Sequence, residues 1–345
     1  MTLESETVND GESAEAETQH HFQLVAKAKK IPDVDCRTPA AEAIQLVLRK
    51  RLETMCALRD RALAWSDPEG VHDMRVASRR LRSALADFKP CLRRDSLPRG
   101  QLKIIADALG AVRDEDVALP ALENLETRLE GNIAEGIELI AEEHRERRRK
   151  GRAALQKAIR KSAVERFQKE FMSQLATAIQ VSGGNSGAKA VRTKQTFRRV
   201  GVEVITNRLK ELIDGSECIF HPTQMKKLHR MRIRAKRLRY AVELFEQCWT
   251  NKAGKIAKEI SNLQTSLGGL HDCDVWIEEI GSWLKKSNRS KGSRSQEGPR
   301  AAAAEWLMRH FAGERTNHYG DALRRWQYWE AEDFLKNLKK MMRKN

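Results

Sequence analysis

The chain is long and strongly basic, with 345 residues and a formal net charge of +16 at pH 7. This length suffices for one large hydrophobic core or two smaller ones, and the charge predicts a polyanionic partner, such as a nucleic acid or a phosphate polymer. No run approaches the roughly 18 apolar residues of a membrane-spanning helix, and the first residues show no secretory signal, so we expect a cytoplasmic protein with no membrane partner. The six cysteines show no CxxC spacing, so we expect free thiols rather than disulfides or a metal site.

Aromatic residues make up only 6% of the chain and good helix formers dominate, which predicts an all-α fold. Residues 1–35 are polar, with six acidic residues and no Lys or Arg in the first 20, and we expect them to form an acidic disordered tail. The next residues, 36–345, are expected to form one domain built from two repeats. The first repeat contains four predicted helices, over residues 38–65, 66–88, 98–129 and 131–181.

A Gly- and Ser-rich linker is expected over residues 182–190. The second repeat, residues 191–342, follows the same plan. Its helices are expected over residues 191–213, 223–249, 253–286 and 300–342, with a solvated loop over 287–299. This order predicts two four-helix bundles.

The two halves carry the same unusual sequence. Residues 71–88, VHDMRVASRRLRSALADF, return 157 residues later as residues 228–245, LHRMRIRAKRLRYAVELF. A second motif follows each copy, as LGAVRDEDV over residues 109–117 and as LGGLHDCDV over residues 267–275. A core can be maintained by many apolar residues of suitable volume, so repetition of the cations indicates a function of their own.

In both copies the cations share one helical face. At about 100° per residue they fall within an arc of roughly 80°, opposite the apolar stripe expected to enter the core. Like charges three or four residues apart repel by a few tenths of a kcal/mol, so such a face favours a bound anion. The alternative is a solvated surface, or pairing with Asp114, Asp116, Asp272 and Asp274. The cationic positions are His72, Arg75, Arg79 and Arg82, and His229, Arg232, Lys236 and Arg239; the core stripes are Met74, Leu81, Leu85 and Phe88, and Met231, Leu238, Val242 and Phe245.

The second motif has a structural and a catalytic interpretation. Its aspartates can cap a helix or orient the basic residues, and its glycine permits close packing. His271 and Asp272, together with His229, also suggest a metal-dependent HD-type phosphohydrolase. The position equivalent to His271 is Arg113, however, so the dyad is not repeated. We favour the structural interpretation and expect no catalytic residue, no metal and no cofactor.

The two basic helices, each followed by the LGxx(R/H)DxDV motif, resemble the CHAD domain family over about residues 38–342. The resemblance implies two four-helix bundles with pseudo-twofold symmetry around a basic groove or pore. It also implies non-enzymatic binding of inorganic polyphosphate and association with polyphosphate granules. Many relatives carry a triphosphate-tunnel domain with a Glu-x-Glu-x-Lys signature, which this chain lacks. Carried over by position, the binding residues are His72, Arg75, Arg79, Arg80, Arg82, His229, Arg232, Lys236, Arg237 and Arg239, with Arg51 and Arg208 added from the first helices.

Polyphosphate binding is the leading hypothesis because a flexible phosphate chain releases counterions when it enters a cationic groove. Nucleic-acid binding is the alternative. Nucleic-acid-binding proteins commonly place aromatic side chains for base stacking, and neither basic face carries one, since Tyr240 lies beyond it. His72 and His229 either donate to phosphate oxygens or serve a structural role. The acidic tail is expected to stay solvated, with competition for the groove as the alternative.

Overall fold

The computed structural model describes residues 31, 33–67, 69–93, 96–179, 181–182, 191–192, 195–249, 252–287 and 294–343. Within these residues the regular structure is almost entirely helical, which confirms the predicted all-α fold. Most of the expected tail and of the expected linker lies outside the described residues. Among the described helices, none has a stretch both long and apolar enough to span a bilayer.

The tail prediction is wrong at its C-terminal end, because the chain is already packed before residue 36. Val34 is buried in the core, and the Asp35 carboxylate accepts hydrogen bonds from the backbone N–H groups of Arg37 and Thr38. Ile31 also packs against the core, but two apolar residues in a polar stretch gave too weak a signal to move the predicted boundary.

The first half departs from the predicted plan at two places. The expected helix 38–65 is interrupted at Leu58, and the expected helix 131–181 is broken at Ile159 and Arg160, where the Ile159 carbonyl accepts a hydrogen bond from Arg59 Nε at 2.7 Å. The elements are α2 (Ala40–Ala57), α3 (Arg59–Leu63), α4 (Gly70–Asp87), η1 (Lys89–Cys91), α5 (Arg99–Glu126), α6 (Gly131–Ala158) and α7 (Lys161–Ala178).

The second half departs from the plan in a similar way. The expected helix 300–342 begins earlier, inside the predicted loop, and is broken at Glu332 and Asp333, where Asp333 has a φ of 50°. Two expected helices of the first half and one of the second are therefore divided, and the prediction of four helices per half is wrong. The elements are α8 (Phe197–Ile213), η2 (Ser216–Phe220), α9 (Met225–Leu244), η3 (Glu246–Cys248), α10 (Lys252–Ser287), α11 (Arg294–Ala331) and α12 (Phe334–Arg343). Between the halves, β1 (Val181–Ser182) and β2 (Val191–Arg192) pair in parallel.

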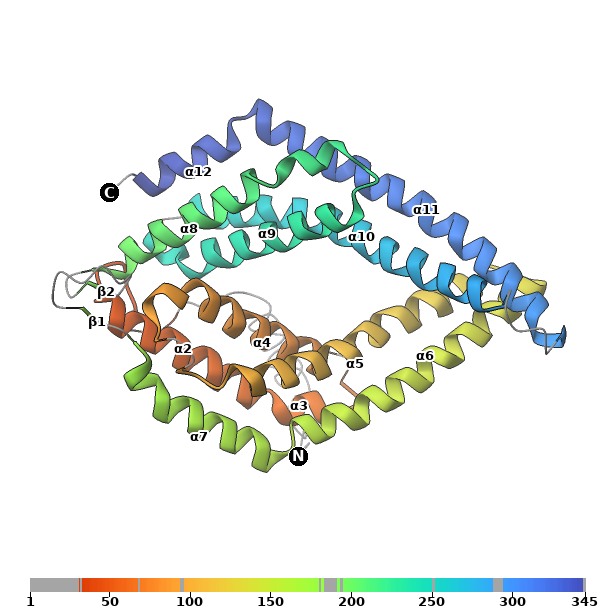
Figure 1. The fold of residues 1–345 in the computed structure, drawn as a ribbon, viewed down its shortest axis with the longest axis horizontal. Helices are drawn as coiled ribbons and strands as arrows, with labels where there is room; N and C mark the ends of the chain where they lie inside the picture. The colour runs from red at the N-terminus through yellow and green to blue at the C-terminus, as the bar shows by residue number, and fades with distance from the viewer. Residues whose placement is uncertain are drawn as a thin grey trace, which may run out of the picture.

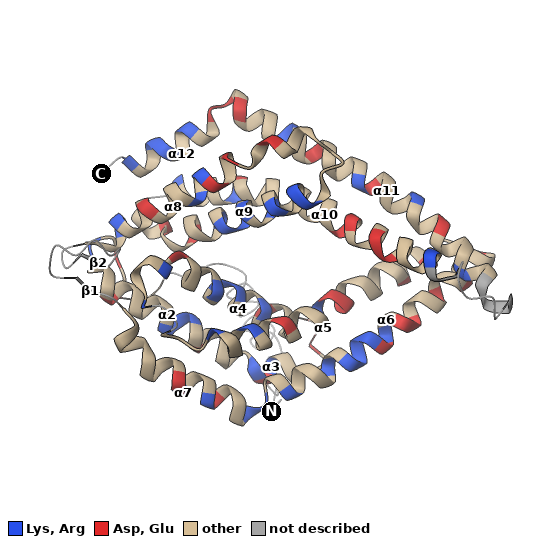
Figure 2. Cartoon of the chain, viewed as in Figure 1, with Lys and Arg blue, Asp and Glu red and all other residues tan. Residues whose placement is uncertain are grey.

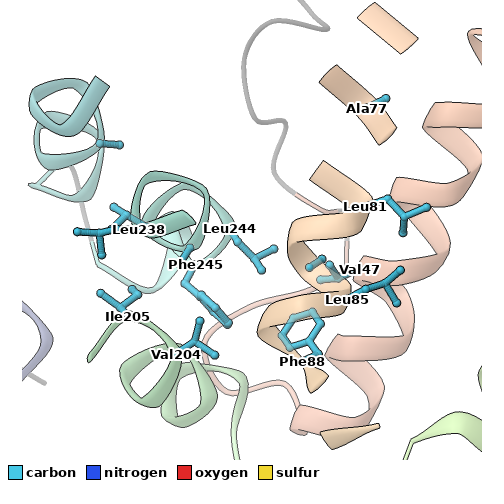
Figure 3. Packing of buried hydrophobic residues seen from close by; sticks show 14 of the residues in the cluster. Val47, Ala77, Leu81, Leu85, Phe88, Val204, Ile205, Leu238, Leu244 and Phe245 are labelled. Carbon is cyan, nitrogen blue, oxygen red and sulfur yellow. The ribbon is translucent and has the colours of Figure 1, made fainter. Parts of the chain in front are cut away.

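The two halves share one hydrophobic core where α4 packs against α9. Phe88 at the end of α4 and Phe245 at the end of α9 meet edge to face, with ring centroids 6.1 Å apart (Figure 3). Phe245 also contacts Phe197 of α8, with ring centroids 4.6 Å apart. Aromatic pairs of this kind stabilise by about 0.5–1.5 kcal/mol beyond the burial of their area. The halves are therefore not independent bundles with separate cores.

The halves meet a second time at the far ends of their longest helices (Figure 1). There α5 and α6 pack against α10 and α11 through a second apolar cluster, which includes Leu122, Ile140, Ile280 and Leu307. Arg147 of α6 adds a polar link between the halves, because it contacts Glu279 of α10 at 2.5 Å and His144 at 2.7 Å. Between these two joints, α4 and α5 face α9 and α10 across the middle of the molecule (Figure 1).

The distal joint provides a test of this arrangement. A Cβ added at Gly136 of α6 would overlap the backbone carbonyl of Pro299 and the Cβ of Ala303, both on α11. Because backbone atoms cannot rotate away, we expect Gly136→Ala to lower the free energy of unfolding by about 1–3 kcal/mol in urea denaturation. Gly313→Ala on α11 is the control, since its Cβ would meet no described atom within 4 Å. This control should retain its stability or gain up to about 1 kcal/mol, and equal stability of the two variants would contradict the close approach.

Candidate functional site

The repeated basic residues lie on α4 and α9, the two helices that pack against each other in the shared core. All eight residues of the predicted apolar stripes are no more than 3% exposed, so their burial is confirmed. The cationic faces therefore point away from the core. Lys and Arg residues are prominent on α4 and α9, whereas Asp and Glu gather on α5 and α10 toward the distal joint (Figure 2).

The cations of the two halves repel one another. Burial, Arg79 and Arg232 lower the pKa of the Lys236 ammonium to about 7, and Arg75 and Arg239 contribute in the same direction. Arg75 and Arg79 belong to α4, whereas Arg232, Lys236 and Arg239 belong to α9. The two basic faces therefore approach each other closely enough to destabilise each other's charge.

Three of these cations form no ion pair with a carboxylate of the described residues. Among the described residues, no Asp or Glu oxygen lies within 4.0 Å of Arg79, Arg232 or Lys236. The Nε of Arg79 is buried without a hydrogen-bond partner in the described part of the chain. A buried guanidinium N–H without an acceptor is unfavourable, so the geometry suits an anionic ligand at this point. We refer to His72, Arg75, Arg79, His229, Arg232 and Lys236 as the central site.

The second motif lies beside an arginine of the central site in both halves. A Cβ added at Gly110 would lie 4.0 Å from Arg75 Nε, and one added at Gly268 would lie 3.8 Å from Arg232 Nε. Each glycine therefore lies beside an arginine side chain, and an added Cβ would make only ordinary van der Waals contact there. Asp114 lies 3.3 Å from Arg75 Nη2. Its equivalent in the second half is Asp272.

Asp114 and Asp272 are exposed to water beside the central site. The Asp114 side chain is 71% exposed, and Asp272 is also exposed. Surrounding protein nevertheless raises the pKa of both carboxyls, against the opposing effects of Arg75 and Arg232. Asp114 also raises the pKa of Asp272, so the equivalent aspartates of the two halves lie near each other. The two carboxylates therefore lie in the same part of the molecule, beside arginines of both halves.

The last aspartate of each motif has a structural role. Asp116 pairs with Arg148 of α6 at 2.7 Å, and Asp274 pairs with Arg315 of α11 at 2.6 Å. Each pair fastens a central helix to the long helix that follows it. Of the four aspartates proposed as partners for the basic faces, Asp116 and Asp274 are thus held elsewhere.

Four of the candidate binding residues lie near Asp87 or Glu243. Neither carboxylate has an acidic equivalent in the other repeat. Arg208 pairs with Asp87 at 2.8 Å, and Arg239 lies 3.5 Å from Glu243. Burial and Arg80 lower the pKa of the Arg51 guanidinium to about 10, while Asp87 and Glu243 oppose this shift. Glu243 likewise opposes the lowering of the Arg80 pKa by burial. These residues therefore form a partly neutralised cluster beside the shared core, and the remaining candidates, Arg82 and Arg237, are exposed.

The surroundings of His72 and His229 in the central site disfavour the protonated form of both imidazoles. Burial and Arg113 lower the pKa of His72, and burial, Arg232 and Lys236 lower that of His229. The His229 ring contacts His271, with centroids 3.9 Å apart, and burial and His229 lower the pKa of His271 to about 4.

Arg113 and His271 thus accompany His72 and His229 at equivalent positions. We did not assign them to the basic site from the sequence, although their alignment in the repeat was a signal. Within the described residues, no group of three or more His, Cys, Asp or Glu side chains could hold a metal ion. The HD-type alternative therefore lacks a metal centre in this part of the chain.

Comparison with known proteins gives consistent results. A family model described as CHAD domain matches residues 46–281. Uncharacterized protein Rv2226 of Mycobacterium tuberculosis is 27% identical over 252 residues, which cover 70% of this chain and 45% of that protein. The chain thus spans less than half the length of this curated relative.

Solved structures show a similar fold. The crystal structure of the CHAD domain from the plant Ricinus communis has a TM-score of 0.64 and 21% identity, covering 84% of this chain and 91% of that one. PptA from Streptomyces chartreusis has a TM-score of 0.61 and 17% identity, covering 84% of this chain and 100% of that one.

The ion pair between Arg208 and Asp87 distinguishes structural cations from those of the central site. Arg208→Ala leaves the Asp87 carboxylate, only 1% exposed, without this partner, so we expect a loss of about 3–5 kcal/mol in the free energy of unfolding. Arg79→Ala removes a cation that repels Lys236, so stability should be unchanged or slightly higher. Urea denaturation followed by circular dichroism measures both. Equal destabilisation of the two variants would contradict this division.

Proposed function

The chain belongs to the CHAD domain family, and on this premise we propose that its central site binds inorganic polyphosphate. The observation that carries the proposal is the group of cations contributed by both halves, in which Arg79, Arg232 and Lys236 have no carboxylate partner among the described residues. A linear polyanion laid along α4 and α9 would neutralise both rows at once. Its phosphate oxygens would accept the hydrogen bonds that the arginines can donate.

We propose that the ligand is bound without being cleaved. The carboxylates beside the central site, Asp114 and Asp272, are close to Arg75 and Arg232. They are thus suited to orienting arginines. A ligand without bases also fits the chemistry of the site, since Tyr240, the aromatic residue beside the second row, is buried. Nucleic acid remains the competing ligand in the tests below.

We further propose that the two halves are related by pseudo-twofold symmetry about the central site. Supporting this, equivalent residues make equivalent contacts: Gly110 and Gly268 lie against an arginine, and Asp116 and Asp274 fasten the following long helix. One phosphate chain would then contact both repeats in similar ways. Binding to long chains would bring the protein to polyphosphate granules in the cytoplasm of a cell that forms them.

Removing two central cations should weaken polyphosphate binding. We expect Arg79→Ala/Lys236→Ala to lower the affinity for long-chain polyphosphate by about tenfold or more, measured by fluorescence anisotropy at fixed salt. The double variant should also show a shallower dependence of affinity on salt, because fewer counterions are released.

The matched control for this experiment is Arg149→Ala/Lys150→Ala. It removes the same charge from exposed positions on α6 that pair with Glu146. Equal loss of affinity in both double variants would mean that net charge, and not the central site, determines binding. Stronger competition by single-stranded or duplex DNA than by polyphosphate would favour the nucleic-acid alternative.

Binding should also take up protons through Lys236. In the free protein its pKa is about 7, and phosphate oxygens near the ammonium would raise this value in the complex. Affinity gained through a raised bound-state pKa is fully present below pH 7 and is lost as the pH rises through the bound-state pKa. We therefore expect uptake of up to one proton at about pH 8, measured by calorimetry in buffers of different ionisation enthalpy. Lys236→Arg, which retains the charge, should abolish this uptake, and uptake that persists in the variant would assign the proton to another group.

A further inference from the structure

A hollow lies outside the central site, where α8 ends and α9 begins. Its volume is about 280 Å³. Lys227, Arg230 and Arg234 of α9 line it, together with Asp214 at the end of α8 and Glu217 of η2. The hollow therefore brings cations from one element opposite carboxylates from two others.

These cations are distinct from those of the central site. At about 100° per residue, Lys227, Arg230 and Arg234 share an arc of roughly 60°, whose centre lies roughly 170° from that of the row from His229 to Arg239. The two basic faces of α9 lie on either side of its buried stripe. A ligand in the hollow would therefore not share side chains with a ligand at the central site.

The cations and carboxylates that line the hollow form no ion pairs with each other among the described residues. Among the described residues, no oxygen of Asp214 or Glu217 lies within 4.0 Å of a cationic nitrogen of Lys227, Arg230 or Arg234. Burial raises the pKa of the Cys218 thiol, and all three cations oppose this shift, which indicates that they converge on the same space.

Two further features indicate that the hollow is built for a ligand. The guanidinium of Arg234 occupies the place that a Cβ at position 215 would take, so Gly215 allows Arg234 to lie across the end of α8. Oε1 of Gln224, which also lines the hollow, is buried without a hydrogen-bond partner in the described part of the chain. A buried acceptor of this kind is suited to a hydroxyl or ammonium donor from a ligand.

The first half fills the equivalent space with protein. The positions equivalent to Lys227, Arg230 and Arg234 are Gly70, Asp73 and Ala77. There α3 covers α4, Asp73 pairs with Arg61 at 2.5 Å, and a Cβ at Gly70 would overlap the Arg61 carbonyl. The shared architecture therefore does not require a hollow at this point, and among the described residues the space and its cations belong to the second half.

We propose that this hollow binds a small phosphate monoester that also carries hydroxyl groups. The α9 cations would hold the phosphate, while Asp214, Glu217 and Gln224 Oε1 would accept hydrogen bonds from the hydroxyls. A bare phosphate would leave two carboxylates facing an anion without donors between them. The volume lies just below the range of about 300–1,000 Å³ typical of pockets for drug-sized ligands, so it suits a compound of the size of glycerol phosphate.

Three probes of similar size separate the two parts of the proposed ligand. We expect glycerol 3-phosphate to bind to the full chain about tenfold more tightly than methyl phosphate in calorimetric titrations, and glycerol to show no binding. Lys227→Ala/Arg230→Ala, which alters two exposed side chains, should lower the affinity for glycerol 3-phosphate by about tenfold or more. Asp214→Ala/Glu217→Ala should bring the affinities for glycerol 3-phosphate and methyl phosphate to within about twofold of each other.

Polyphosphate binding provides the control that separates this proposal from the proposed function. Lys227→Ala/Arg230→Ala should retain most of the wild-type polyphosphate affinity, and Arg79→Ala/Lys236→Ala should retain the wild-type affinity for glycerol 3-phosphate. The proposal is overturned if glycerol 3-phosphate does not bind at millimolar concentration, or if it binds no better than methyl phosphate. It is also overturned if the central-site variant loses glycerol 3-phosphate binding, since the probe would then occupy the central site.

Discussion

Mutual repulsion between cations of the two halves is the constraint on which the rest of this structure depends. Arg75 and Arg79 on one side and Arg232 and Lys236 on the other lie near enough for Lys236 to lose much of its basicity. Such an arrangement exists only because other contacts hold the halves together. The aromatic contact between Phe88 and Phe245 does so at one end, and the apolar cluster of the four long helices does so at the other. The favourable free energy of packing therefore offsets the repulsion between cations that would otherwise separate.

The carboxylates discussed above fall into two groups, those that pair with arginines outside the central site and those that lie beside its cations. Asp87, Asp116 and Asp274 form ion pairs that join helices, and these pairs do not involve the cations of the central site. Asp114 and Asp272 remain beside the cations, where their exposure and raised pKa fit a role in orienting arginines. Because these three carboxylates pair with other arginines, an excess of positive charge remains at the central site. A polyanion would supply the missing neutralisation.

The two halves have diverged where the central site does not constrain them. In the first half α3 covers the outer face of α4, whereas the second half leaves a charged hollow beside α9. Glu243 and Asp87 likewise have no acidic counterpart in the other repeat. The repeated positions are those that form the core stripe, the basic rows and the aspartate supports. The unrepeated positions determine which arginines are neutralised and where a second ligand could bind.

The sequence by itself determined the fold class, the apolar stripes of α4 and α9 and the faces on which the cations lie, because helical periodicity depends only on local geometry. It also identified the second motif as a structural support for the basic residues. Only the tertiary structure decided which cations are balanced, because the partners of Arg208 and Arg51 come from helices distant in sequence. The breaks at Ile159 and Asp333 were missed because they depend on packing between helices of the same half, and the shared core was missed because it depends on packing between the halves. Electrostatic interactions act through space, and periodicity along one helix carries no information about which charge another helix places opposite it.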